Sequence, residues 1–194
     1  MDVSVFLEPK LDLTRIAELL DGLGHEGRLH TVGTWSKKQQ AAIFEAAKGV
    51  RPLTLEHLVP ADTEPLVQVI HDGRNTLPLF SRFQKRFCKP DDDKAKDVLW
   101  GYNHGVTMPY TGPGYFVAKA GDEGELVIDY RELPPSHPAS WPPILPNSAR
   151  LGMFVYEGMV DYLRGISEHV SIGRAWKKGE MMDAWFVLVR QDPA

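Results

Sequence analysis

The chain has 194 residues, which is long enough for one domain with a full core, and its 43% hydrophobic and 25% charged content argues against disorder. A net charge of -4 argues against nucleic acid as a partner, because proteins that bind nucleic acid usually carry a basic stripe. Cys88 is the only cysteine, which excludes an intramolecular disulfide and a cysteine-rich metal site.

Neither a signal peptide nor a membrane-spanning segment is expected. The first residues lack the basic start and long apolar stretch of a signal peptide. No run approaches the roughly 18 apolar residues that a membrane span needs. We therefore expect a cytoplasmic protein.

Three helices are predicted before residue 61. Over residues 12–23, leucines and an isoleucine recur at helical spacing. A second helix, over residues 36–49, begins with the capping-box pair Ser36 and Gln39. A third helix, over residues 54–60, is one or two turns long because a proline ends it.

The next segment is predicted to hold a short strand and a fourth helix. Residues 65–70 favour a strand, and residues 71–75 have turn chemistry. Between Leu77 and Lys89 (residues 77–89), phenylalanines recur at helical spacing and basic residues occupy the other side. We interpret this as a solvated helix packed on the core, and peripheral membrane contact through its basic side is the alternative.

The sheet proper is predicted to start near residue 98. Alternation over residues 98–106 places Trp100, Tyr102 and His104 on one face and glycines and an asparagine on the other. We expect the aromatic face to point into the protein. The small residues opposite would let a ligand or another chain segment approach closely.

A hairpin and a proline-rich strap are predicted next. Residues 114–120 and 125–133 form two strands around a Gly-containing tip. Residues 133–146 contain six prolines, so they cannot form a central strand or a helix interior. We expect this strap to pack across a barrel mouth or one sheet face.

The last region, residues 152–190, is predicted to be a meander of antiparallel strands. Val170 and Ile172 alternate with Ser171 and Gly173, as in a strand. After a polar turn, residues 184–189 (AWFVLV) favour a strand that is covered on both faces.

Local motifs do not specify a chemistry. The Gly-Pro-Gly at residues 112–114 leads into a strand, whereas a phosphate loop leads into a helix. The seven histidines lack the close spacing of metal ligands, so no metal site and no cofactor are expected. No Gly-x-Ser-x-Gly nucleophile motif occurs, and Cys88 is expected to be a buried, inert thiol.

General acid–base chemistry has two candidates, His104 and Asp161, which both fall in predicted strands. Asp129 alternates with Leu126, Ile128 and Tyr130, so it faces solvent if these three residues face the interior.

The C-terminal meander, FVYEGMVDYLRGISEHVSIGRAWKKG followed by AWFVLVR, resembles the closing strands of calycin-like proteins, the lipocalin and fatty-acid-binding group. The resemblance covers the C-terminal half of the chain and depends on strand pattern. It implies an antiparallel barrel that holds one small apolar ligand.

The sequence predicts one α+β domain in which N-terminal helices pack on a strongly bent antiparallel β-sheet or lipocalin-like β-barrel of about six to eight strands. Residues 1–90 would form the mostly helical layer and residues 97–191 the barrel.

The expected function is binding of a small apolar or amphipathic molecule in the barrel interior. The candidate ligand-binding residues are aromatic or histidine residues in strands: Trp100, Tyr102, His104, Tyr115, Trp176 and Trp185. One alternative is a cofactor-free isomerase, cyclase or hydrolase that uses His104 with Asp161. The other is an interaction module with a filled core, whose working surface is residues 77–89 or the strap. The sequence does not indicate the oligomeric state.

Overall fold

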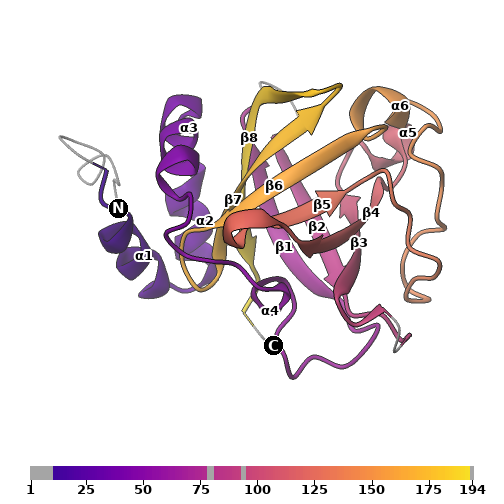
Figure 1. Cartoon of the computed structure of the whole chain (residues 1–194), viewed down its shortest axis with the longest axis horizontal. Helices are drawn as coiled ribbons and strands as arrows, with labels where there is room; N and C mark the ends of the chain where they lie inside the picture. The colour runs from indigo at the N-terminus through magenta and orange to yellow at the C-terminus, as the bar shows by residue number, and fades with distance from the viewer. Residues whose placement is uncertain (1–10, 78–80, 93–94, 193–194) are drawn as a thin grey trace.

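Eight antiparallel strands close into a barrel in a computed structural model that describes residues 11–77, 81–92 and 95–192 (Figure 1). Each strand pairs with the next one along the chain, and β8 pairs with β1 to close the barrel. The strands are β1 Val69–Asn75, β2 Arg82–Cys88, β3 Val98–His104, β4 Tyr115–Ala120, β5 Leu126–Asp129, β6 Met159–Gly165, β7 Val170–Lys177 and β8 Glu180–Arg190. The predicted antiparallel barrel is therefore confirmed. A barrel of this size is filled by side chains or holds one small ligand.

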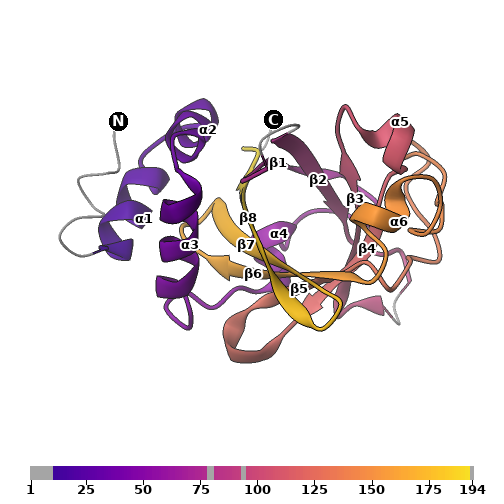
Figure 2. The ribbon, with the colours of Figure 1, turned by 90° about the horizontal axis from the view of Figure 1, so that it is seen from above.

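Three helices cover the outer face of β7 and β8: α1 Leu13–Asp21, α2 His25–Gly33 and α3 Lys37–Ala46. Figure 2 shows them side by side outside the barrel wall. Asp12 caps α1, and Ser36 and Gln39 form the predicted capping box of α3. The sequence analysis did not predict α2, whose segment HEGRLHTVG contains two glycines and little apolar periodicity.

The strand β8 is covered on both faces, as its apolar run predicts. Val187 and Val189 pack outward against the helical layer. Phe186 and Leu188 point inward and join the core of the barrel. The turn before β8 is tight, because Lys178 and Gly179 both have positive φ (55° and 93°), as in a two-residue type I′ hairpin turn.

The first two strands lie where the sequence predicted a turn and a basic helix. β1 includes residues 71–75, of which residues 71–74 pair with both β2 and β8. β2 runs through the segment predicted to be a helix, so the prediction of an amphipathic helix at residues 77–89 is wrong. Its expected first turn at residues 78–80 lies outside the described residues. The barrel therefore begins at Val69, and the membrane contact proposed for that helix loses its structural basis.

Short helices lie at the two ends of the barrel (Figure 1). At one end, α4 Leu55–Leu58 places Leu58 and Val59 in the interior apolar cluster and closes that end. At the other end lie α5 Met108–Thr111 and α6 Gly152–Val155. The helix α6 corrects the sequence prediction, in which the meander of strands began at residue 152. A short 3-10 turn, η3 Asp122–Gly124, forms the tip between β4 and β5.

The proline-rich strap packs on the outer face of β3 and β4, which was one of its two expected places. The Trp141 ring lies 4.8 Å from the Tyr102 ring and 6.2 Å from the Tyr115 ring. The Tyr115 hydroxyl donates to the Pro142 carbonyl at 2.5 Å. Asn147, directly after the strap, donates to the Tyr115 carbonyl on β4 and to the Tyr130 carbonyl just after β5, which anchors this end of the strap.

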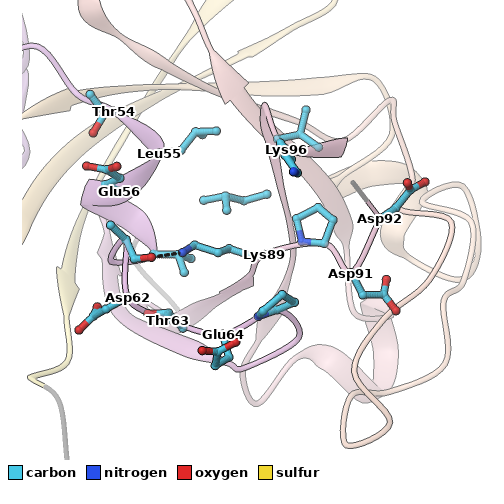
Figure 3. A pocket seen from close by; sticks show the side chains of 16 residues that line it. Thr54, Leu55, Glu56, Asp62, Thr63, Glu64, Lys89, Asp91, Asp92 and Lys96 are labelled. Atoms are coloured by element: carbon cyan, nitrogen blue, oxygen red, sulfur yellow. Dashed lines mark hydrogen bonds between the residues drawn. The ribbon is translucent and has the colours of Figure 1, made fainter. Parts of the chain in front are cut away.

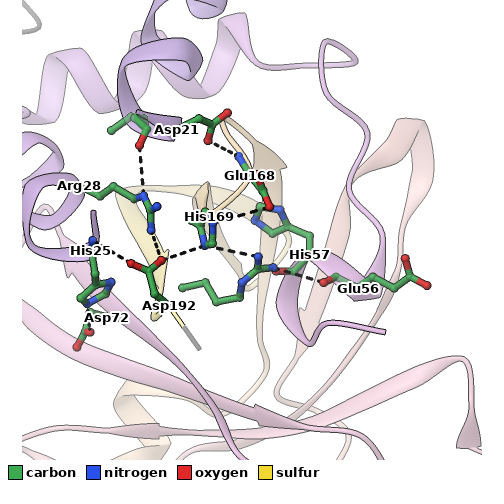
Figure 4. A network of polar contacts seen from close by, with 11 residues as sticks. Asp21, His25, Arg28, Glu56, His57, Asp72, Glu168, His169 and Asp192 are labelled. Carbon is green, nitrogen blue, oxygen red and sulfur yellow. Dashed lines mark hydrogen bonds and ion pairs between the residues drawn. The ribbon is translucent and has the colours of Figure 1, made fainter. Parts of the chain in front are cut away.

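A polar network joins the helical layer to the α4 end of the barrel (Figure 4). Arg28 on α2 pairs with Asp192 at 2.6 Å, and Asp192 lies 3.7 Å from His169. Arg190 donates to the carbonyl of His57 on α4 at 2.5 Å. The network therefore holds α2, α4 and the segment after β8 together.

Candidate functional site

Two hollows lie at opposite ends of the barrel. The larger, about 760 Å³, lies between α4 and the loop that follows β2 (Figure 3). Its lining carries charges of both signs, and Lys89 Nζ donates to the Ala61 carbonyl across it at 2.6 Å. Because Leu58 and Val59 fill the barrel behind it, this hollow is a surface trough.

The second hollow, about 390 Å³, enters the barrel between α6, β8 and the strand ends near α5. Its walls are mostly apolar and include Phe83, Phe154, Tyr156, Met159, Ala175, Met182, Ala184, Trp185 and Phe186. At its inner end the lining changes to Lys85, Asn103, Tyr130 and Asp161. An apolar cavity with a few polar groups at one end is typical of a small-molecule site.

Glycines in the wall allow aromatic rings to lie flat inside the barrel. A Cβ atom added at Gly101 would lie 2.3 Å from the Phe116 ring, and one added at Gly173 would lie 2.2 Å from the Phe186 ring. The close approach that the sequence suggested for the β3 glycines is thus made by a side chain of the next strand.

The polar cluster brings four strand segments together inside the barrel. Lys85 Nζ on β2 lies 3.0 Å from Asp161 Oδ2 on β6 and donates to Asn103 Oδ1 on β3 at 3.0 Å. It also donates to the Tyr130 hydroxyl, which follows β5 and lies 3.3 Å from Asp161 Oδ2. Asn103 Nδ2 donates to the Tyr130 hydroxyl and to the Gly114 carbonyl, each at 3.0 Å. All four side chains are buried.

Aromatic rings surround the Lys85 amine. Its Nζ lies 4.9 to 5.7 Å from four ring centroids, those of Tyr130, Phe116, Phe186 and Phe83. Burial lowers the pKa of Lys85, and the neighbouring Asp161 carboxylate opposes this shift. Burial also raises the pKa of Tyr130 well above its ordinary value, and the Asp161 charge acts in the same direction. At neutral pH Tyr130 is therefore a protonated hydroxyl.

The structure corrects the orientation expected for β3. Leu99 and Asn103 face the barrel interior, whereas Trp100 and Tyr102 face outward beneath the strap. The face was misassigned because the strap makes the outer side of β3 apolar and buried.

Tyr115, His104 and Trp185 among the other candidates lie on the outer side of the wall. Tyr115 lies in the cluster under the strap, and His104 packs against Tyr102 on the same outer side. Trp176 lies against Arg131, with 6.0 Å between the guanidinium carbon and the ring. Of the six aromatic and histidine candidates, Trp185 lines the cavity at its rim.

The two acid–base candidates do not come together. Asp161 is in the interior cluster, while His104 is on the outer side of β3. The structure therefore does not form the expected His104–Asp161 pair. Asp129 points outward, as predicted from the inward positions of its neighbours. It is buried rather than solvent-exposed, because Arg131 covers it with a 2.6 Å ion pair.

Sequence reasoning missed Lys85 and Asn103 as interior residues. In RFQKRFC, Phe83, Lys85 and Phe87 are spaced by two, so a strand reading would have placed the lysine between two inward phenylalanines. The polar residue at an inward position broke the alternation, which made helical spacing the better match.

The described residues contain no group of three or more histidine, cysteine, aspartate or glutamate side chains placed to hold a metal ion. None of the helices in the described part of the chain has the length and apolar character needed to span a membrane. Comparison with protein-family models, curated proteins and solved structures finds no match.

Proposed function

We propose that this protein binds one small, largely apolar molecule in the barrel mouth, as calycin-like barrels do. The observation that carries the proposal is the cavity of about 390 Å³ that runs from an apolar rim to the buried Lys85–Asp161 cluster. Apolar walls supply affinity by removing ligand surface from water, and the polar end fixes the ligand's orientation.

The rim supports this proposal because it carries exposed apolar side chains. Phe154 is 73% exposed and Met182 is 38% exposed, and both line the cavity. Exposed apolar side chains gathered at a cavity mouth are typical of a site that an apolar ligand enters and covers.

Filling the cavity tests the proposal. Ala184 lines the cavity, so Ala184→Phe places a ring in the space that the ligand needs. Ala139→Phe makes the same change at an exposed strap position outside the cavity. Binding of a fluorescent apolar probe, measured by titration, is expected to weaken at least about tenfold in Ala184→Phe and to stay unchanged in Ala139→Phe.

Native mass spectrometry of the purified chain provides an independent readout, because a retained ligand adds its mass to the folded protein and not to the denatured one. Equal probe affinity in wild type and Ala184→Phe would contradict binding in this cavity.

A further inference from the structure

The inner end of the barrel-mouth cavity carries no net charge. Lys85 and Asp161 are each 2% exposed and lie 3.0 Å apart. If the shared proton is on the amine, the two groups form an ion pair, and if it is on the carboxyl, both are neutral. In either case the pair contributes zero charge, so it does not attract a charged ligand group.

A charged ligand group would be unfavourable beside this pair. A carboxylate would place a second negative charge next to Asp161 in a nearly dry space, and an ammonium would place a second positive charge next to Lys85. Burying either charge without a partner is unfavourable, because the ion loses its hydration and gains no compensating contact.

The hydrogen-bonding capacity of the cluster is also asymmetric. An ammonium has three N–H donors, and Lys85 directs them to Asp161, Asn103 and Tyr130. It therefore has no N–H left to donate to a ligand oxygen. Among the described residues, both donors to Asp161, Lys85 and Tyr130, meet Oδ2, so Oδ1 keeps its acceptor capacity.

Arg82 is the one further charged residue among the described residues that line this cavity. It is exposed at the rim, where water and salt screen its charge. An attraction at this position is weaker than the penalty for a charged group at the dry inner end.

We infer that the ligand's inner end is an uncharged hydrogen-bond donor, such as an alcohol, that donates to Asp161 Oδ1. This inference rests on the proposed function and deepens it by naming the ligand class. A primary alcohol donates to the free acceptor and adds no charge. A fatty acid anion of the same length has no O–H to donate and adds a negative charge.

Three ligands of equal chain length test this directly: decanol, decanoate and decylamine. In calorimetric titrations of the full chain at about pH 8, decanol is expected to bind at least about tenfold more tightly than either charged analogue. Between about pH 8 and pH 6, decanoate is expected to gain affinity, because the protonated acid carries an O–H donor and no charge. The affinity of decanol stays constant over the same range.

Asp161→Asn removes the negative charge from the Lys85–Asp161 pair. Asp129→Asn is the control, because it makes the same change at a buried aspartate on the outer side of the wall. In Asp161→Asn the order is expected to reverse in favour of decanoate, because the charge of Lys85 is no longer balanced. Asp129→Asn is expected to keep the wild-type order. Circular dichroism checks that each variant is folded. The pH series uses the wild type, so it tests the inference even if a variant does not fold.

Decanoate binding as tightly as decanol to the wild type at pH 8 would overturn this inference and leave the proposed function standing. Failure of all three molecules and of the fluorescent probe to bind would overturn both.

Discussion

Lys85 is the residue that most sharply distinguishes this barrel interior from a plain apolar core. Its amine is surrounded by aromatic rings and paired with a carboxylate that is equally buried. Such a pair is not itself a strong source of stability, because the cost of taking both charges out of water offsets their attraction. Breaking the pair is costly, since the remaining charge stays buried without its partner.

Lys85→Met is therefore expected to lower the free energy of unfolding by about 3–5 kcal/mol, since it leaves Asp161 unpaired. The double variant Lys85→Met/Asp161→Asn removes both charges and is expected to recover most of that loss. Urea denaturation at neutral pH measures both effects. A double variant that is as unstable as Lys85→Met would show that lost packing, rather than the unpaired charge, causes the effect.

At the scale of single elements, two histidines lie where α4 closes one end of the barrel: His71, which is fully buried, and His57, which is partly buried. His71 on β1 bonds the Leu58 carbonyl at the end of α4 with its Nε2 at 2.9 Å. His57 lies on α4 itself. Burial lowers the pKa of each of these histidines from 6.5 to about 3 in the folded protein.

These two residues predict acid sensitivity. Because the folded pKa is depressed, the unfolded chain binds protons below about pH 6.5 while the folded chain does not, so stability falls as pH decreases from 6.5 towards 3. Each histidine contributes a slope of up to about 1.4 kcal/mol per pH unit within that window, and above pH 6.5 neither contributes a slope.

Replacing one histidine tests the assignment. His71→Gln is expected to lower the slope between pH 6 and pH 4 by up to about 1.4 kcal/mol per pH unit, as measured by urea denaturation at several pH values. His30→Gln changes an exposed histidine on α2 and serves as the control. An unchanged slope in His71→Gln would show that other groups dominate the acid sensitivity.

At the scale of the whole molecule, the helical layer and the barrel share a core. Phe44 on α3 is 1% exposed in the cluster that joins the helices to β7 and β8. The Arg164 guanidinium lies 3.9 Å from the Phe44 ring centroid, and Arg164 also donates to the Phe44 carbonyl at 2.7 Å. Helices and barrel are therefore expected to unfold as one unit.

Phe44→Ala is expected to cost about 3–5 kcal/mol of unfolding free energy, because it leaves a cavity in this shared core. Far-ultraviolet circular dichroism and tryptophan fluorescence should show one coincident transition that moves to lower denaturant concentration. Val50→Ala, at a 59% exposed position, is the control. Loss of the helical signal before the fluorescence transition would instead indicate two independent units.

The sequence alone determined those elements whose signals are local. Capping side chains and apolar spacing predicted α1 and α3, and alternation with turn chemistry predicted the β4–β5 and β7–β8 hairpins. Proline content predicted the irregular strap, and alternation in β5 predicted that Asp129 lies on the opposite face from Leu126, Ile128 and Tyr130. These features depend on neighbours within a few residues, which is why a single sequence was sufficient.

Tertiary structure alone decided where the interior lies and what it contains. The strap covers the outside of β3, so apolar residues there point away from the barrel, while Asn103 points into it. Lys85 and Asp161 are tolerated inside because they meet across the barrel at 3.0 Å, although they are distant in sequence. A buried polar residue is stable only with a partner, and only the closed barrel brings these partners together.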